Sequence, residues 1–196
     1  MATSDRVLPW RRVNAAPQEE LAPLLATYRQ FHHKASTQLV SRAYEVARGA
    51  HRDQVRSSGE SYINHPLAVA RIVAELGLDD TTLAAALLHD AVEDTDLTIE
   101  QVQKDFGADV AAIVDGVTKL DRLKFDSREA QQAATMRKML VAMSRDLRVL
   151  IIKLADRLHN MRTIAAMPAD KQRRIAKETM DIYACLLYTS DAADDT

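Results

Sequence analysis

Residues 87–95 read Leu-Leu-His-Asp-Ala-Val-Glu-Asp-Thr and place ionisable groups at the end of an apolar helical run. On a helix, residues four apart share a face, so His89 shares one with Glu93. By the same spacing, Asp90 lies on a neighbouring stripe with Asp94. Three carboxylates and an imidazole this close repel one another unless protons or a cation neutralise them. The stretch therefore indicates a divalent metal ion, although an isolated His-Asp pair is more often a hydrogen-bonded surface couple.

The composition predicts an all-α protein. The 196 residues suffice for one domain with its own core. Only five Gly and five Pro occur, and 47% of the residues are hydrophobic, which favours helices over turn-rich sheet structure. A net charge of -2 gives no general reason to bind nucleic acid or an anionic membrane. The sequence carries no signal for a particular oligomeric state.

The single cysteine, Cys185, excludes an internal disulfide framework and suits a reducing compartment. No apolar run is long enough to span a membrane, and the N-terminus lacks the apolar core of a signal peptide. A cytoplasmic location is therefore expected.

Apolar residues at helical spacing predict the secondary structure. Residues 1–17 show no clean period and are expected to be a flexible lead, and the domain itself is expected over residues 18–184. Residues 50–64 form one long polar loop, which either contacts an anionic ligand or is a solvated connector. The predicted helices cover residues 18–28, 35–48, 66–76, 81–90, 98–106, 108–119, 127–143, 146–166 and 169–184.

A second unusual run, residues 149–160, is an apolar segment from which Asp156 emerges. A carboxylate on a buried helix requires a cationic partner. Lys153 or Arg157 could provide it, and for a lone aspartate that interpretation is favoured. Metal ligation becomes the better account because the chain also supplies two histidines and a second aspartate in apolar surroundings. The resulting ligand set, drawn from three helices, is His65, His89, Asp90 and Asp156.

Imidazole and carboxylate ligands without thiolate suit manganese, iron, zinc or cobalt. A metal of this kind polarises phosphoryl oxygens and activates water. Glu93 and Asp94 follow the ligands by one helical turn. They are placed either to handle protons or to hold a ligand from outside the coordination sphere, and the sequence leaves both roles open.

Four segments, taken in order, carry a family resemblance: residues 54–66, 85–95, 116–120 and 152–163. Together they resemble the HD superfamily of metal-dependent phosphohydrolases, a helical-bundle fold. More narrowly, they resemble the hydrolase domain of the RelA/SpoT-type bifunctional (p)ppGpp synthetase/hydrolases. Order and spacing agree from about residue 35 to residue 184.

The resemblance implies a specific reaction and a specific site. The reaction is removal of the 3′-pyrophosphate of the guanine nucleotide alarmones ppGpp or pppGpp, giving GDP or GTP and pyrophosphate, with Mn²⁺ held by the four predicted ligands. It implies that Glu93 and Asp94 act on the nucleophilic water. It also implies that the substrate is bound by Arg56 against the guanine, by Ser58, and by Asn160 and Thr163 near the ribose and phosphates.

The chain also departs from that family. Its members continue into synthetase and regulatory domains, so the sequence resembles a truncated member. Residues 185–196 resemble nothing in the family, and we expect them to be foreign sequence, in which case Cys185 is not native. Two other functions remain open: a different HD-family nucleotide phosphohydrolase, or a non-catalytic nucleotide-sensing module.

Overall fold

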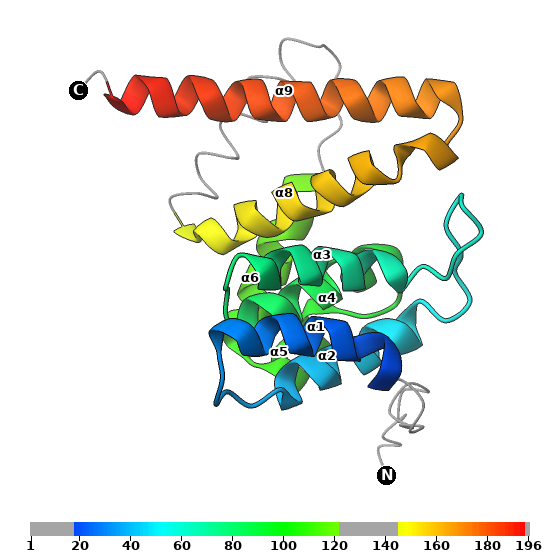
Figure 1. Ribbon diagram of the computed structural model, residues 1–196, viewed down its shortest axis with the longest axis vertical. Helices are drawn as coiled ribbons and strands as arrows, with labels where there is room; N and C mark the ends of the chain where they lie inside the picture. The colour runs from blue at the N-terminus through cyan, green and yellow to red at the C-terminus, as the bar shows by residue number, and fades with distance from the viewer. Residues whose placement is uncertain (1–17, 122–144, 195–196) are drawn as a thin grey trace, which may run out of the picture.

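The computed structural model describes residues 18–121 and 145–194, which are almost entirely helical. The predicted all-α class is confirmed, and in these ranges the only β-type pairing is an isolated bridge between Val55 and Ser61. The helix predicted over residues 127–143 lies outside the described residues. The elements are α1 Gln18–Phe31, α2 Gln38–Ala50, α3 Asn64–Glu75, α4 Asp80–Asp94, α5 Ile99–Phe106, α6 Ala108–Asp121, α8 Leu147–Arg162, the 3₁₀ turn η2 Ile164–Ala166 and α9 Ala169–Asp194 (Figure 1).

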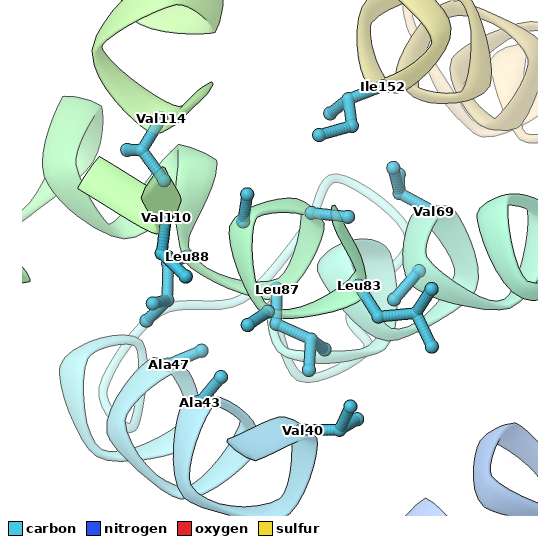
Figure 2. Close-up of a cluster of buried hydrophobic side chains, with 14 of the residues drawn as sticks. Val40, Ala43, Ala47, Val69, Leu83, Leu87, Leu88, Val110, Val114 and Ile152 are labelled. Atoms are coloured by element: carbon cyan, nitrogen blue, oxygen red, sulfur yellow. The ribbon is translucent and has the colours of Figure 1, made fainter. Parts of the chain in front are cut away.

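Helix α4 is the centre of the fold. Its residues from Leu83 to His89 are all buried, and α2, α3, α6 and α8 pack around it. Figure 2 shows Leu83, Leu87 and Leu88 of α4 between Val40 of α2 and the apolar side chains of the other helices. Burying one such side chain stabilises the fold by roughly 1.5–3 kcal/mol. The end of α4 is thereby held rigidly, and the ionisable residues follow on the same helix.

Helix α4 is longer than predicted. It begins after Asp79, whose carboxylate accepts a hydrogen bond from the Thr82 backbone N–H at 2.9 Å. It ends at Asp94 and not at Asp90, because the polar residues after Asp90 continue the helix along its exposed side. At the start of the next helix, α5, Thr98 and Gln101 form a capping box.

Helix α8 packs against α3 and α6, and α9 lies against α8 (Figure 1). The helix predicted over residues 146–166 ends at Arg162, and η2 follows as a separate turn. Helix α9 continues to Asp194 without a break at residue 184, so the domain boundary placed there stays a prediction. No helix among the described residues has both the length and the apolar composition needed to cross a membrane.

Gly116 allows α6 and α8 to approach closely. A Cβ at this position would lie 2.7 Å from Val149 Cγ2, well inside van der Waals contact. Overpacking of this kind costs about 1–3 kcal/mol, against about 1 kcal/mol by which alanine favours a helix over glycine. We therefore expect Gly116→Ala to lower the free energy of unfolding by up to about 2 kcal/mol in urea denaturation.

Val149→Ala provides the matched background for this test, because it removes the methyl group that clashes. In that background Gly116→Ala should be neutral or stabilising. An equal loss of stability in both backgrounds would show that the close approach of α6 to α8 does not explain the glycine.

Candidate metal centre

Three helices bring histidine and aspartate side chains to one point. His65 lies in the first turn of α3, His89 near the end of α4 and Asp156 in the middle of α8. All three are buried, and one ligand atom from each lies within 4.8 Å of the others. His65 Nε2 is 3.0 Å from Asp156 Oδ1. The predicted convergence of three distant segments is therefore present, with the geometry of a group that could hold a metal ion.

Asp90, the fourth predicted ligand, stands between the two histidines. Its Oδ1 lies 2.9 Å from His89 Nε2, and its Oδ2 lies 3.4 Å from His65 Nε2. The carboxylate therefore faces the same space as the other three groups.

His89 is oriented for metal binding. Its Nδ1 lies 2.8 Å from the Ala86 carbonyl oxygen, which can only accept, so Nδ1 carries the proton. Its Nε2 is buried and, despite the nearby Asp90 oxygen, makes no hydrogen bond of acceptable geometry. A buried nitrogen without a partner costs free energy, and a divalent ion between the ligands would satisfy it. The residues present therefore fit such an ion.

The charges at the site are strongly coupled. Burial alone would raise the pKa of Asp156, but its hydrogen bond from His65 and the ammonium of Lys153, 3.1 Å away, hold that pKa far below its usual value. Burial alone would lower the pKa of His89, yet the Asp90 carboxylate raises it to about 9. A proton on His89 and a metal ion are thus alternative ways to neutralise the same carboxylates.

The two predicted catalytic carboxylates lie one turn farther along α4. Glu93 and Asp94 are both exposed. Tyr62 links Asp94 to the metal centre, because its hydroxyl lies 3.1 Å from Asp94 Oδ2 and 3.2 Å from Asp90 Oδ2. Burial and both aspartates raise the pKa of Tyr62, so its hydroxyl remains a proton donor at neutral pH.

The predicted substrate-binding residues lie near His65 and Asp156 or line an adjoining cavity. The Arg56 guanidinium donates to Asn160 Oδ1 at 2.9 Å, and Asn160 Nδ2 in turn donates to Asp156 Oδ1 at 2.7 Å. Arg56, Ser58 and Thr163 line a cavity of about 260 Å³ between the polar loop and η2. Arg56 and Asn160 are therefore joined to the residues of the metal centre by hydrogen bonds. Ser58 and Thr163 line the same cavity as Arg56.

Two residues at the site were missed by the sequence analysis. Tyr62 comes from the polar loop, where no periodicity indicates side-chain direction. His159 follows Asp156 by three residues on α8, a spacing that places both on one helix face and that could have identified it. Its Nδ1 lies 2.7 Å from His65 Nδ1. Burial, His65 and Arg56 lower the pKa of His159 to about 4, so the ring is neutral at pH 7.

Comparison with known proteins identifies relatives of this site. The sequence profile of the HD domain matches residues 43–188. The guanosine-3′,5′-bis(diphosphate) 3′-pyrophosphohydrolase of Haemophilus influenzae is 59% identical over 143 residues, which cover 73% of this chain and 21% of that protein. The bifunctional (p)ppGpp synthase/hydrolase SpoT of Escherichia coli is 51% identical over 170 residues, or 87% of this chain and 24% of that protein.

A probable GTP pyrophosphokinase of Mycobacterium leprae is 55% identical over 168 residues, covering 86% of this chain and 21% of that protein. The chain thus spans about a fifth to a quarter of the length of these curated relatives. Among solved structures, a metazoan ortholog of SpoT that hydrolyses ppGpp superposes with a TM-score of 0.65 at 28% sequence identity. That match covers 78% of this chain and 88% of the other.

Proposed function

The chain belongs to the HD-domain family, and we propose that it is a hydrolase that removes the 3′-pyrophosphate of ppGpp or pppGpp. The observation that carries the proposal is the convergence of His65, His89 and Asp156 on one point, next to a cavity lined by Arg56 and Ser58. The names of the similar bacterial proteins and of the solved metazoan ortholog support the same substrate. In the cell we place this activity in the cytoplasm.

We propose that the divalent ion is Mn²⁺, held by two imidazoles and two carboxylates: His65, His89, Asp90 and Asp156. This donor set contains no thiolate and leaves room for further oxygen ligands, as manganese prefers. When bound, the ion supplies positive charge for the substrate phosphates and makes water a better nucleophile at neutral pH.

The protein's own residues provide the remaining steps. Water adds to the phosphorus next to the ribose 3′-oxygen, and the bond between that phosphorus and the 3′-oxygen breaks. Glu93 or Asp94 accepts the proton that water loses, and the 3′-oxygen takes up a proton as it leaves. The guanidinium of Arg56 is planar and can stack on the guanine, while Ser58, Asn160 and Thr163 contact the nucleotide. GDP and pyrophosphate are the products of ppGpp.

Tyr62 should matter for the rate of hydrolysis. Its hydroxyl bridges Asp90 and Asp94, so Tyr62→Phe leaves both carboxylates in place without their shared donor. Loss of an outer partner of this kind typically costs about 10–100-fold in activity, and we expect kcat to fall by that amount. Tyr28→Phe, the same change at a buried tyrosine of α1, is the control. Equal kcat in the Tyr62 variant and the wild type would show that the bridge has no role.

The proposed function is tested by incubating the purified chain with ppGpp and Mn²⁺ and measuring pyrophosphate release, with and without a chelator. We expect GDP and pyrophosphate in equal amounts, and none with chelator present. A folded, metal-loaded sample that forms no product would refute the proposal.

The same assay distinguishes the two alternatives. A different HD phosphohydrolase would turn over another nucleotide in a substrate panel faster than ppGpp. A nucleotide-sensing module would bind guanine nucleotides without forming product, and its binding would survive Glu93→Gln and Asp94→Asn.

A further inference from the structure

His159 has a position that none of the proposed roles uses. It lies on α8, one turn after Asp156, and its ring is tilted by 45° to that of His65 with ring centroids 4.9 Å apart. The two Nδ1 atoms are 2.7 Å apart, a hydrogen-bond distance. Two nitrogens at this distance need one proton between them, so one ring donates and the other accepts.

The metal centre determines which ring donates. His65 directs its Nε2 toward Asp156 Oδ1, at 3.0 Å, and toward Asp90. When a cation takes the place of the hydrogen bond from His65 Nε2 to Asp156, the neutral imidazole offers its Nε2 lone pair to that cation and carries its proton on Nδ1. His65 Nδ1 is then the donor, and His159 Nδ1 is the acceptor.

Arg56 contacts both rings. A guanidinium can only donate hydrogen bonds, and Arg56 Nη1 lies 3.3 Å from His159 Nδ1 and 3.1 Å from His65 Nδ1. When His65 Nδ1 carries a proton, the contact of Arg56 with His65 is not a hydrogen bond. The lone pair of His159 Nδ1 can then accept from both His65 and Arg56.

We propose that His159 is a positioning residue, which fixes the ring orientation and tautomer of His65 by accepting its Nδ1 proton. The proposal rests on metal binding by His65 in the proposed function. Ligating histidines commonly donate a hydrogen bond from the N–H of their second ring nitrogen to a carboxylate, carbonyl or water. Loss of such a partner typically lowers metal affinity or activity by about 10–100-fold. Here a second imidazole takes that place. Among the described residues, those that line the adjacent cavity do not include His159.

Two variants separate this role from simple packing. His159→Leu fills a similar volume but offers no acceptor. His159→Asn places its amide oxygen near the position of Nδ1 and can still accept the proton. The hydrogen bond from the Thr163 hydroxyl to the His159 backbone carbonyl is preserved in both. His33→Leu, at an exposed position between α1 and α2, is the matched control.

The measurement is the Mn²⁺ dissociation constant, obtained from the electron paramagnetic resonance signal of free Mn²⁺, together with the Tm of the metal-free protein. We expect His159→Leu to raise the Kd by about 10–100-fold with the metal-free Tm unchanged. His159→Asn should restore most of the affinity, and His33→Leu should match the wild type.

Several results would overturn the proposal. One is a His159→Leu variant that binds Mn²⁺ as tightly as the wild type. Another is a His159→Asn variant that loses as much affinity as the leucine variant, because affinity would then follow packing and not the acceptor. A lower metal-free Tm in both variants, in step with the loss of affinity, would likewise assign His159 to packing. A wild-type chain that binds no Mn²⁺ would instead refute the metal site of the proposed function.

Discussion

Asp156→Asn is expected to abolish both metal binding and ppGpp turnover. Asp156 Oδ1 faces His65 Nε2 at 3.0 Å, and its Oδ2 faces Lys153 Nζ at 3.1 Å. Asparagine has nearly the same shape but removes the negative charge, so the cation loses a carboxylate while the Lys153 ammonium stays beside it. The Mn²⁺ affinity should fall by more than the roughly 100-fold limit for outer partners, and no pyrophosphate should be detected.

Calorimetric titration with Mn²⁺ measures this effect directly. Asp170→Asn, an identical change at an exposed position of α9, is the control and should bind Mn²⁺ like the wild type. Near-normal affinity and turnover in the Asp156 variant would remove this residue from the ligand set.

Asp94→Asn is expected to lose activity while keeping the metal. Asp94 is exposed on the last turn of α4 and accepts a hydrogen bond from the Tyr62 hydroxyl, which the amide oxygen of asparagine can still accept. What asparagine cannot do is take a proton from water. Loss of a general base costs typically about 10²–10⁴-fold, so kcat should fall by that amount with the Mn²⁺ affinity unchanged.

Glu93→Gln tests the other carboxylate in the same way, and the variant with the larger loss of kcat identifies the proton acceptor. Asp96→Asn, in the exposed segment after α4, is the control. If neither Glu93→Gln nor Asp94→Asn lowers kcat, neither carboxylate accepts the proton that the attacking water loses. Loss of Mn²⁺ from the Asp94 variant would give this residue a structural role at the metal centre.

Composition and helical periodicity predicted the class of fold, and histidines and aspartates in apolar surroundings predicted the convergence at the metal centre. Runs such as residues 83–88 and 149–160 are rich in apolar residues, which indicates central helices. The ionisable residues within or directly after these runs were therefore expected to lie near one another. Helix ends were less predictable. Helix α4 extends to Asp94 because exposed polar residues are compatible with continuing a helix that is already anchored by its core.

The polar loop is where sequence reasoning was weakest. The loop contains the bridge between Val55 and Ser61 and a turn at Gly59, with φ of +85°. It brings Arg56 to His65 and the Tyr62 hydroxyl to the two aspartates of α4. Neither contact follows from spacing along the chain, because loop side chains have no fixed period. His159 differs, since its separation of three residues from Asp156 on one helix could be read from the sequence.

The central claim is that one divalent ion binds between α3, α4 and α8. Anomalous X-ray scattering from a crystal of the chain grown with Mn²⁺ tests it most directly. We predict one strong anomalous peak in coordination contact with four side chains: His65, His89, Asp90 and Asp156. A peak only at the protein surface, or none despite excess Mn²⁺, would contradict the account.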